Sequence, residues 1–415
     1  MNILRVIASM NPASGGPCQG IRNSIPELEK LGIHNEVVCL DDPREQFKMK
    51  DSFKIYALGP AKTPWCYSNK LFPWLTENLI RFDAVIVHGL WLYNGYATLK
   101  AINSIQKNKA QKTPKLFVMP HGMLDPYFQL TSARKLKAIR NTLYWKFIES
   151  KLIEKADGVL FTTETELVLA RSTFKTYKPK KELNIGYGIQ QPPQLFSINS
   201  GQLFNKFPLL KNKPFFLFLS RIHNKKGIDL LIEAYDIMLQ QKGAVKKVAH
   251  HAEGFDAFDE VRNELPLLVI AGPGLDTTYG FKIAKTVAAS TRLSKFVIFT
   301  GMLSGSMKWE AFYNCDAMIL PSHQENFGIA VVEALACSKP VLISDQVNTW
   351  REISHYKAGL VEPNTLEGTL SLLTKWDALT SNEKTLMAEN ARECFLENFA
   401  IKPAALRLVT ILKGK

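Results

Sequence analysis

The chain has 415 residues, of which 46% are hydrophobic, and this length suffices for two domains of roughly 200 residues each. The apolar content and the 24 Phe exclude a disordered protein, and no apolar run approaches the roughly 20 residues that a membrane-spanning helix needs. The net charge of +14 is concentrated in residues 1–200, where 27 Lys and Arg face 16 Asp and Glu, which fits nucleic acid, an anionic membrane or phosphorylated ligands as partners.

The six cysteines are scattered along the chain and form no CxxC pair. This excludes a zinc ribbon and gives no disulfide framework, so a reducing compartment is expected. The first residues, MNILRVIASMNP, carry no charged lead-in and no cleavage site, and they are interpreted as a strand and not as a signal peptide. We therefore expect a cytoplasmic protein.

In the first half, short β-rich apolar runs alternate with helical stretches. Strands are expected at 2–9, 35–40, 82–89, 115–122 and 158–163, with helices at 68–80, 94–107 and 133–155. Helices between successive strands indicate a parallel sheet with helices on both faces. The segment 189–194, with Pro192 and Pro193, favours an extended connector, so the linker between two domains is placed there.

The second half repeats this alternation. Strands are expected at 214–220, 266–272, 297–301, 317–321 and 340–344, and helices at 226–240, 279–290, 306–313, 328–338 and 382–397. The segment 243–259 is predicted to be a surface loop, and its adjacent His250 and His251 point different ways, so no metal site is expected there. Two open α/β sheets in tandem bind ligands outside the carboxyl ends of their strands, and if the two crevices face each other the site is the cleft between the domains.

Gly15 and Gly16 follow the first strand in the run Ser-Gly-Gly-Pro. Glycines at this turn allow the backbone to approach a phosphate closely, although a plain turn uses the same residues. The run is not GxGxxG, and no acidic residue at the right place indicates a nicotinamide cofactor.

His121 lies in Pro-His-Gly-Met-Leu-Asp-Pro, at the carboxyl end of a predicted first-half strand. Its imidazole is a candidate for contacting a sugar or an acceptor across the cleft, and capping or packing is the alternative. His88 in VIVHGLW is a weaker candidate for the acceptor pocket.

Residues 131–155 hold seven Lys and Arg against two Glu, interleaved with apolar residues. Most helices of this kind have one face in the core and one in solvent. The alternative hypothesis is that this helix docks on an anionic inner leaflet, where a lipid-linked acceptor would be found. Neither a helix-turn-helix nor an aromatic-basic pattern supports nucleic-acid binding.

Arg221 and Lys226 follow the strand FFLFL in the run Ser-Arg-Ile-His-Asn-Lys-Lys-Gly. Two cations at this end of a strand can offset the charge on a departing diphosphate, and removing one such donor typically costs about 10²–10³ in rate. A solvated polar loop is the plainer interpretation of the same residues.

Glu325 and Glu333 give the strongest pattern, Glu-Asn-Phe-Gly-Ile-Ala-Val-Val-Glu, directly after the predicted strand 317–321. Gly328 is expected to open a helix, whose first amides point toward an anion. A sugar nucleotide fits this spacing, with the pyrophosphate near the helix end and one carboxylate each for the sugar and the ribose. The plain alternative is an ordinary helix with one Glu before it and one inside.

With these motifs in place, the chain resembles family 4 of the retaining glycosyltransferases, which have the GT-B fold: two doubly wound Rossmann-like α/β domains facing across a cleft. The resemblance covers essentially the whole chain and is most specific over 214–363. It is also carried by Ala271-Gly-Pro-Gly274 and by Phe299-Thr-Gly301. It implies an acceptor-binding domain at 1–190, with 391–415 packing back onto it, and a donor-binding domain at 195–390.

The resemblance also implies roles for single residues. Arg221 and Lys226 would bind the diphosphate, Glu325 the transferred sugar and Glu333 the ribose. The remaining implied contacts are His121 beside the sugar, Gly15 and Gly16 at the phosphate, Phe327, Gly328 and Ile329 through their amides, and Met302 and Leu303 against the base.

The implied reaction is hexosyl transfer from a UDP- or GDP-sugar to a hydroxyl of a glycan or lipid-linked acceptor, for surface polysaccharide or glycolipid synthesis. It would proceed with retention by a front-face route, without a metal or another cofactor. Two alternatives stay open on the same fold: a sugar-nucleotide epimerase and a non-catalytic protein that binds nucleotide sugars.

Overall fold

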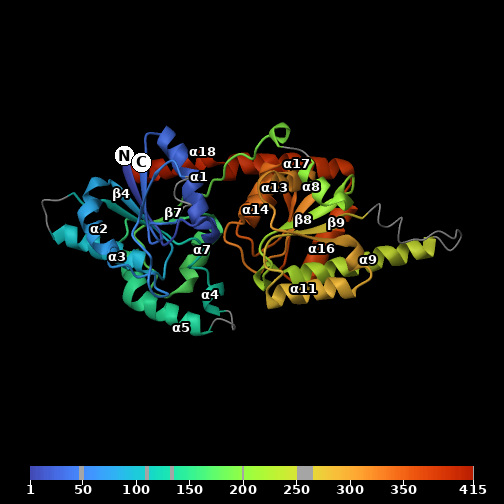
Figure 1. The fold of residues 1–415 in the computed structure, drawn as a ribbon, viewed down its shortest axis with the longest axis horizontal. Coiled ribbons are helices and arrows are strands. Elements are labelled where there is room, and N and C mark those ends of the chain that lie inside the picture. The colour runs from blue at the N-terminus through green and yellow to red at the C-terminus, as the bar shows by residue number, and fades with distance from the viewer. Residues whose placement is uncertain (46–50, 108–111, 131–134, 199–200, 250–264, 415) are drawn as a thin grey trace. The chain divides into compact units, whose positions relative to one another are not determined.

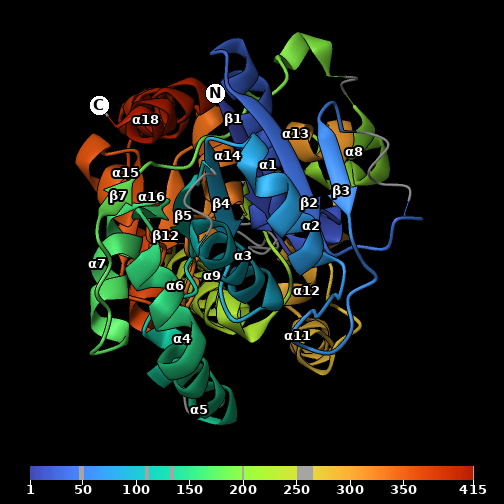
Figure 2. The ribbon, with the colours of Figure 1, turned by 90° about the vertical axis from the view of Figure 1, so that its left-hand side faces the viewer.

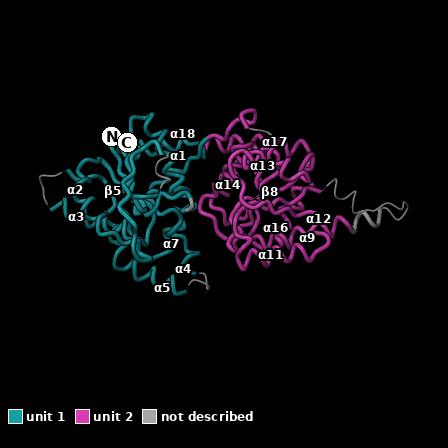
Figure 3. The backbone as a smooth tube through the Cα atoms, in the orientation of Figure 1, with its two compact units in different colours: residues 1–190, 399–415 teal, residues 191–398 magenta. Residues whose placement is uncertain are grey.

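The structure is a computed structural model that describes residues 1–45, 51–107, 112–130, 135–198, 201–249 and 265–414. The chain forms two compact units, shown in different colours in Figure 3. Unit 1 comprises residues 1–190 and 399–415, and unit 2 comprises residues 191–398.

Unit 1 is built on a seven-stranded sheet in the order β3-β2-β1-β4-β5-β6-β7, and every neighbouring pair is parallel. The chain enters at β1, proceeds outward to β3 and then returns to β4, so the direction of winding changes between β1 and β4 (Figure 1; these strands are labelled in Figure 2). The strands are β1 (Asn2–Val6), β2 (His34–Cys39), β3 (Lys54–Ala57), β4 (Ala84–His88), β5 (Lys115–Met119), β6 (Gly158–Phe161) and β7 (Glu182–Asn184).

Helices cover both faces of this sheet, because its central strands are apolar on both sides. Leu4 and Val6 of β1 pack into a core cluster that also holds residues of α2, α3 and α6. The alternate residues of β1 point to the opposite face, where α1 and α18 contact each other (Figure 2). The helices of unit 1 are α1 (Gly16–Lys30), α2 (Leu71–Asn78), α3 (Tyr93–Lys107), α4 (Tyr127–Leu130), α5 (Lys135–Tyr144), α6 (Ser150–Lys155), α7 (Glu164–Thr173) and α18 (Ile401–Lys413).

The last helix belongs to unit 1 although it follows unit 2 in the chain. Ile189 and Ala400 form a parallel bridge, with Ile189 N–H donating to Phe399 O (2.9 Å) and Ile401 N–H donating to Ile189 O (3.1 Å). These bonds hold the start of α18 beside the segment that leaves unit 1.

Unit 2 contains a six-stranded parallel sheet in the order β10-β9-β8-β11-β12-β13. Its winding changes direction between β8 and β11. The strands are β8 (Phe215–Leu219), β9 (Leu267–Ala271), β10 (Val297–Gly301), β11 (Ala317–Leu320), β12 (Val341–Ser344) and β13 (Gly359–Glu362). Its helices are α8 (Gln202–Lys206), α9 (Ile228–Ala249), α11 (Thr278–Ala289), α12 (Leu293–Phe296), α13 (Gly305–Asn314), α14 (Ile329–Ala336), α15 (Trp350–Tyr356), α16 (Leu366–Ala378) and α17 (Ser381–Cys394).

Two expected elements differ from the structure. The predicted loop at 243–259 is wrong in its first part, because α9 continues to Ala249. The rest of that segment, with His250 and His251, lies outside the described residues. The single helix predicted at 133–155 is α5, a π-helical turn at Trp145–Glu149 and α6, while residues 131–134 lie outside the description.

Within the described residues, no helix combines the length and the apolar character needed to cross a membrane.

Candidate functional site

The side chains of Lys226 and Glu325 meet where the winding of unit 2 changes direction. Lys226 follows β8 in a short 3-10 turn, Asn224–Lys226, and Glu325 follows β11, the neighbouring strand. The Lys226 ammonium donates directly to a Glu325 carboxylate oxygen. Open α/β sheets bind their ligands at such a change of winding, outside the carboxyl ends of the strands.

Backbone contacts hold the loops after β8, β11 and β12 together. Lys225 O accepts from His323 N–H (2.9 Å) and from the Ser322 hydroxyl (3.0 Å). Glu325 forms a parallel bridge with Val347, so its backbone is fixed on both sides. Gly227 has φ +65, and a Cβ there would lie 2.0 Å from a backbone oxygen of the loop after β11. The loops can approach this closely because position 227 is a glycine.

The turn Ala271-Gly-Pro-Gly274 joins the same edge of the sheet. Ser220 N–H donates to Ala271 O (3.0 Å), and a Cβ on Gly272, whose φ is +149, would lie 1.9 Å from Ser220 O. The turn therefore supports the segment that carries Arg221. The Arg221 side chain is exposed and makes no hydrogen bond or ion pair with another described residue.

Gly328 caps the start of α14 in the left-handed conformation, with φ +71. The first amides of an α-helix lack partners within the helix and carry its positive dipole end, so this position suits an anion. Glu333 lies inside α14, one turn further along than the cap.

Lys308 on α13 pairs with Glu333, with 2.6 Å between Nζ and Oε1. Burial raises the pKa of the Glu333 carboxyl, and the neighbouring ammonium of Lys308 opposes that rise. Lys308 is not predictable from the sequence, since a lysine on a helix is usually solvated and nothing in its spacing points to Glu333. Each of the two predicted carboxylates of this unit thus has its own lysine.

Met302 and Leu303 follow β10, at the same edge of the sheet. Met302 is 71% exposed, whereas the Leu303 side chain is buried at 6%. The Met302 side chain is therefore open to a ligand at this edge, whereas the Leu303 side chain is not.

In unit 1, Gly15 and Gly16 form the turn between β1 and α1. Gly15 has φ +91, and a Cβ there would meet nothing within 4 Å. The Tyr187 hydroxyl donates to Gly16 O (2.6 Å), which fixes the turn against the segment that follows β7. The turn lies at the change of winding between β1 and β4.

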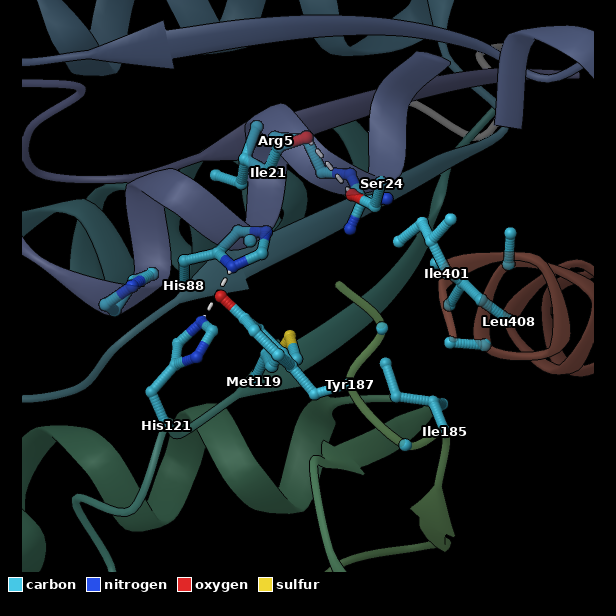
Figure 4. Close-up of a pocket in the computed structure, with 16 residues that line it drawn as sticks. Arg5, Ile21, Ser24, His88, Met119, His121, Ile185, Tyr187, Ile401 and Leu408 are labelled. Carbon is cyan, nitrogen blue, oxygen red and sulfur yellow. Dashed lines mark hydrogen bonds between the residues drawn. The ribbon is translucent and has the colours of Figure 1, made fainter. Parts of the chain in front are cut away.

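His121 follows β5 and has φ +55, a conformation that is uncommon outside glycine and that concentrates at functional sites. Next to it, Gly122 N–H donates to the buried Glu166 carboxylate, which also accepts from Thr162 N–H (2.8 Å). His121 Nε2 lies 2.9 Å from His88 Nδ1, so the structure brings the two candidate histidines together (Figure 4).

The predicted residues therefore form two groups. His121, Gly15 and Gly16 lie in unit 1, and the other nine lie in unit 2: Arg221, Lys226, Met302, Leu303, Glu325, Phe327, Gly328, Ile329 and Glu333. Within the described parts of the chain, no three His, Cys, Asp or Glu side chains are arranged to hold a metal ion.

Two doubly wound parallel sheets define the GT-B class of fold. The chain is similar to a solved structure of Alr3699/HepE from Anabaena in complex with UDP and glucose (TM-score 0.71, 16% identity). The similarity covers 100% of both chains. At this identity the likeness concerns the fold.

Residues 200–393 match the family model described as glycosyl transferases group 1. The O-antigen chain mannosyltransferase C of Escherichia coli is 28% identical over 61% of this chain and 59% of its own length. The alpha-monoglucosyldiacylglycerol synthase of Streptococcus pneumoniae is 26% identical over 48% of this chain and 44% of its own length. Residues 200–393, within unit 2, thus belong to the group 1 glycosyl transferase family, and the chain spans about half the length of the curated relatives it matches.

Proposed function

We propose that the protein is a retaining glycosyltransferase that moves a hexosyl group from a UDP- or GDP-sugar to a hydroxyl of a glycan or lipid-linked acceptor. The observation that carries the proposal is the pairing of Lys226 with Glu325 and of Lys308 with Glu333 at the ligand-binding edge of unit 2. In this proposal unit 2 holds the donor and unit 1 the acceptor.

The two lysine–carboxylate pairs suit a nucleoside diphosphate sugar. When the diphosphate binds, Lys226 can turn from Glu325 to a phosphate oxygen, and the freed carboxylate can accept hydrogen bonds from the sugar hydroxyls. Exposed Arg221 and the dipole of α14 add positive potential for the same phosphates. Glu333 can accept from the ribose hydroxyls, and the ammonium of Lys308 favours its ionised form.

The chemistry proposed for these groups is positioning and charge stabilisation. The acceptor hydroxyl attacks the anomeric carbon on the face from which the diphosphate leaves, and a leaving phosphate oxygen takes the hydroxyl proton. Arg221 and Lys226 then stabilise the negative charge that develops on the diphosphate. No metal or other cofactor enters this scheme.

Thermal shift with UDP, GDP, ADP and NAD, without metal, tests the donor site. A ligand at 100 times its Kd adds about 2.7 kcal/mol of stability. We expect a shift with UDP or GDP that disappears in Arg221→Ala. Stabilisation by NAD only, or by no diphosphate, would overturn the proposal, and conversion of a free sugar nucleotide to its epimer would favour the epimerase alternative.

One face of α5 carries exposed apolar side chains, and we include docking of this face on a membrane in the proposal. Leu136, Ile139 and Leu143 are exposed by 84%, 60% and 53%, and their spacing places them on one side of the helix. Phe147, 59% exposed, continues the row in the π-helical turn. The exposed cations around this row are Lys135, Lys137, Arg140, Lys146 and Lys151.

An apolar row flanked by cations complements an anionic lipid surface. We therefore propose that the protein is a cytoplasmic enzyme that docks peripherally on the inner face of the membrane. Sedimentation with vesicles of anionic lipid at low salt is the test. Leu136→Ser with Ile139→Ser should release the protein, whereas Phe281→Ser, at a 67% exposed position of unit 2, should not. Equal binding of all three proteins, or none by the wild type, would refute docking through α5.

A further inference from the structure

A small cavity of about 40 Å³ lies within unit 1, between the sheet and helices α1 and α18 (Figure 4). Strands supply Arg5, His88 and Met119 to its lining, and His121 and Tyr187 lie in the segments that follow β5 and β7. This volume accommodates a water molecule where polar groups are present to hold it.

Arg5 is a buried cation on the central strand β1. Its Nε–H donates to Asn35 Oδ1 (3.1 Å), whereas its Nη2 is buried without a partner. Burial lowers the pKa of its guanidinium to about 10, so it stays charged at neutral pH. Arg5 pairs in register with Ile86, two residues before His88, which places Arg5 and His88 on the same face of the sheet.

His88 lines the same cavity as Arg5 and His121. Its Nδ1 is 2.9 Å from His121 Nε2, so one proton is shared between these two atoms. Its other nitrogen, Nε2, is buried without a partner and belongs to the same cavity lining as the unpaired Nη2 of Arg5. A guanidinium only donates hydrogen bonds, so a water that bridges it to Nε2 of His88 makes that nitrogen an acceptor.

The role of His88 Nε2 as an acceptor determines which ring nitrogens of His88 and His121 carry protons. If His88 Nε2 accepts, its proton is on Nδ1 and is donated to His121 Nε2. The proton of neutral His121 must then be on Nδ1, which makes no hydrogen bond with another described residue. We propose that Arg5 and His88 are positioning residues that hold His121 as a neutral imidazole presenting Nδ1–H to a sugar hydroxyl of the substrate that unit 1 binds.

The proposal rests on the function proposed above, in which unit 1 holds the acceptor. A neutral donor can hold a sugar hydroxyl without placing a positive charge next to the cationic sugar of the transition state. Burial and the charge of Arg5 both lower the pKa of His121, to about 3, which agrees with the neutral form. The charge that sets the tautomers of His88 and His121 thus comes from Arg5 on β1, which is separated from β5 by β4.

Long-range ¹H–¹⁵N spectra of protein labelled at histidine test the proton positions without any activity. In the wild type at pH 7, His88 and His121 should both carry the proton on Nδ1 and not on Nε2, the commoner form in water. Arg5→Met should return His88 to the Nε2–H form, and Arg5→Lys should keep Nδ1–H. Nε2–H on either histidine of the wild type, or no change in Arg5→Met, would overturn the proposal.

His88→Phe gives a second test should Arg5→Met not fold. We expect its kcat for sugar transfer to fall about 10- to 100-fold, with the Kd for the nucleoside diphosphate unchanged, because that ligand's proposed contacts lie in unit 2. An unchanged kcat would refute the positioning role. Failure to bind any nucleoside diphosphate would instead refute the proposed function, and the tautomer spectra would still be interpretable.

Discussion

Glu149 provides a test of the structure through the dependence of stability on pH. Its side chain is fully buried in the π-helical turn, where Oε1 accepts from Trp91 N–H (2.7 Å) and Oε2 has no partner. Burial raises the pKa of this carboxyl from 4.5 to about 8, and the bond from Trp91 opposes that rise only in part. At neutral pH the folded protein therefore carries Glu149 in its protonated form.

The direction of the pH effect follows from the two pKa values. In the unfolded chain Glu149 loses its proton near pH 4.5, whereas in the folded chain it keeps the proton until about pH 8. Between these values the folded state binds more protons, so the free energy of unfolding falls as the pH rises and levels off above pH 8. A rise in pKa of this size corresponds to roughly 3–5 kcal/mol, since one pKa unit is worth about 1.4 kcal/mol.

Glu149→Gln removes this titration and keeps an oxygen for Trp91 N–H. We expect the variant to be more stable than the wild type by roughly 2 kcal/mol at pH 6 and by roughly 3–5 kcal/mol at pH 9, with a difference in Tm of roughly 5–15 °C at pH 9, at about 2–4 °C per kcal/mol. Differential scanning calorimetry from pH 6 to 9 measures it. Glu154→Gln, at an exposed position of α6, is the matched control and should follow the wild type. A difference between Glu149→Gln and wild type that is independent of pH would refute the reasoning.

Three further predictions concern the sites themselves. Lys226→Met leaves the Glu325 carboxylate without its ion pair and should lower the rate of sugar transfer about 10²–10³-fold in a steady-state assay, so an unchanged kcat would contradict its role. Gly227→Ala should destabilise unit 2 by more than about 1 kcal/mol in chemical denaturation, because its Cβ would lie 2.0 Å from Pro321 O and its φ is positive; a neutral effect would show that the loops are not this close. Burial lowers the pKa of His88 well below 6.5, so as the pH falls the unfolded chain binds a proton at His88 before the folded chain does. The free energy of unfolding should therefore fall as the pH drops below about 6.5. In His88→Phe the Tm should fall less between pH 7 and 5 than in the wild type.

The sequence predicted the central strands of both sheets and missed β3, β7 and β13. These three strands lie at sheet edges. The central strands are mostly buried and contain apolar runs, whereas the strands KIYA, ELN and GLVE are only partly buried or exposed and contain polar residues. Pairing with a neighbouring strand makes them strands, and pairing of this kind is not visible in a short window of sequence.

The candidate site was predictable where glycines and charges follow strands. Glu325 and Lys226 follow predicted strands, and the carboxyl ends of parallel strands lie at one edge of an open sheet. The sequence alone therefore predicts that both side chains lie at that edge, although it does not predict their ion pair. Lys308, Arg5 and the partnership of His88 with His121 depend on contacts between distant segments. A buried Arg in the strand NILRV is indistinguishable from a solvated one until the helices that cover it are placed.

Sugar transfer with defined stereochemistry is the most direct test of the central claim. The protein should be incubated with anomerically pure UDP- and GDP-hexoses and with membranes that supply lipid-linked acceptors, and the release of nucleoside diphosphate and the anomeric configuration of the product should be followed by NMR. We expect transfer from one nucleotide series with retained configuration, reduced at least about 10²-fold in Glu325→Gln. Inverted configuration, or transfer that Glu325→Gln leaves intact, would contradict the account.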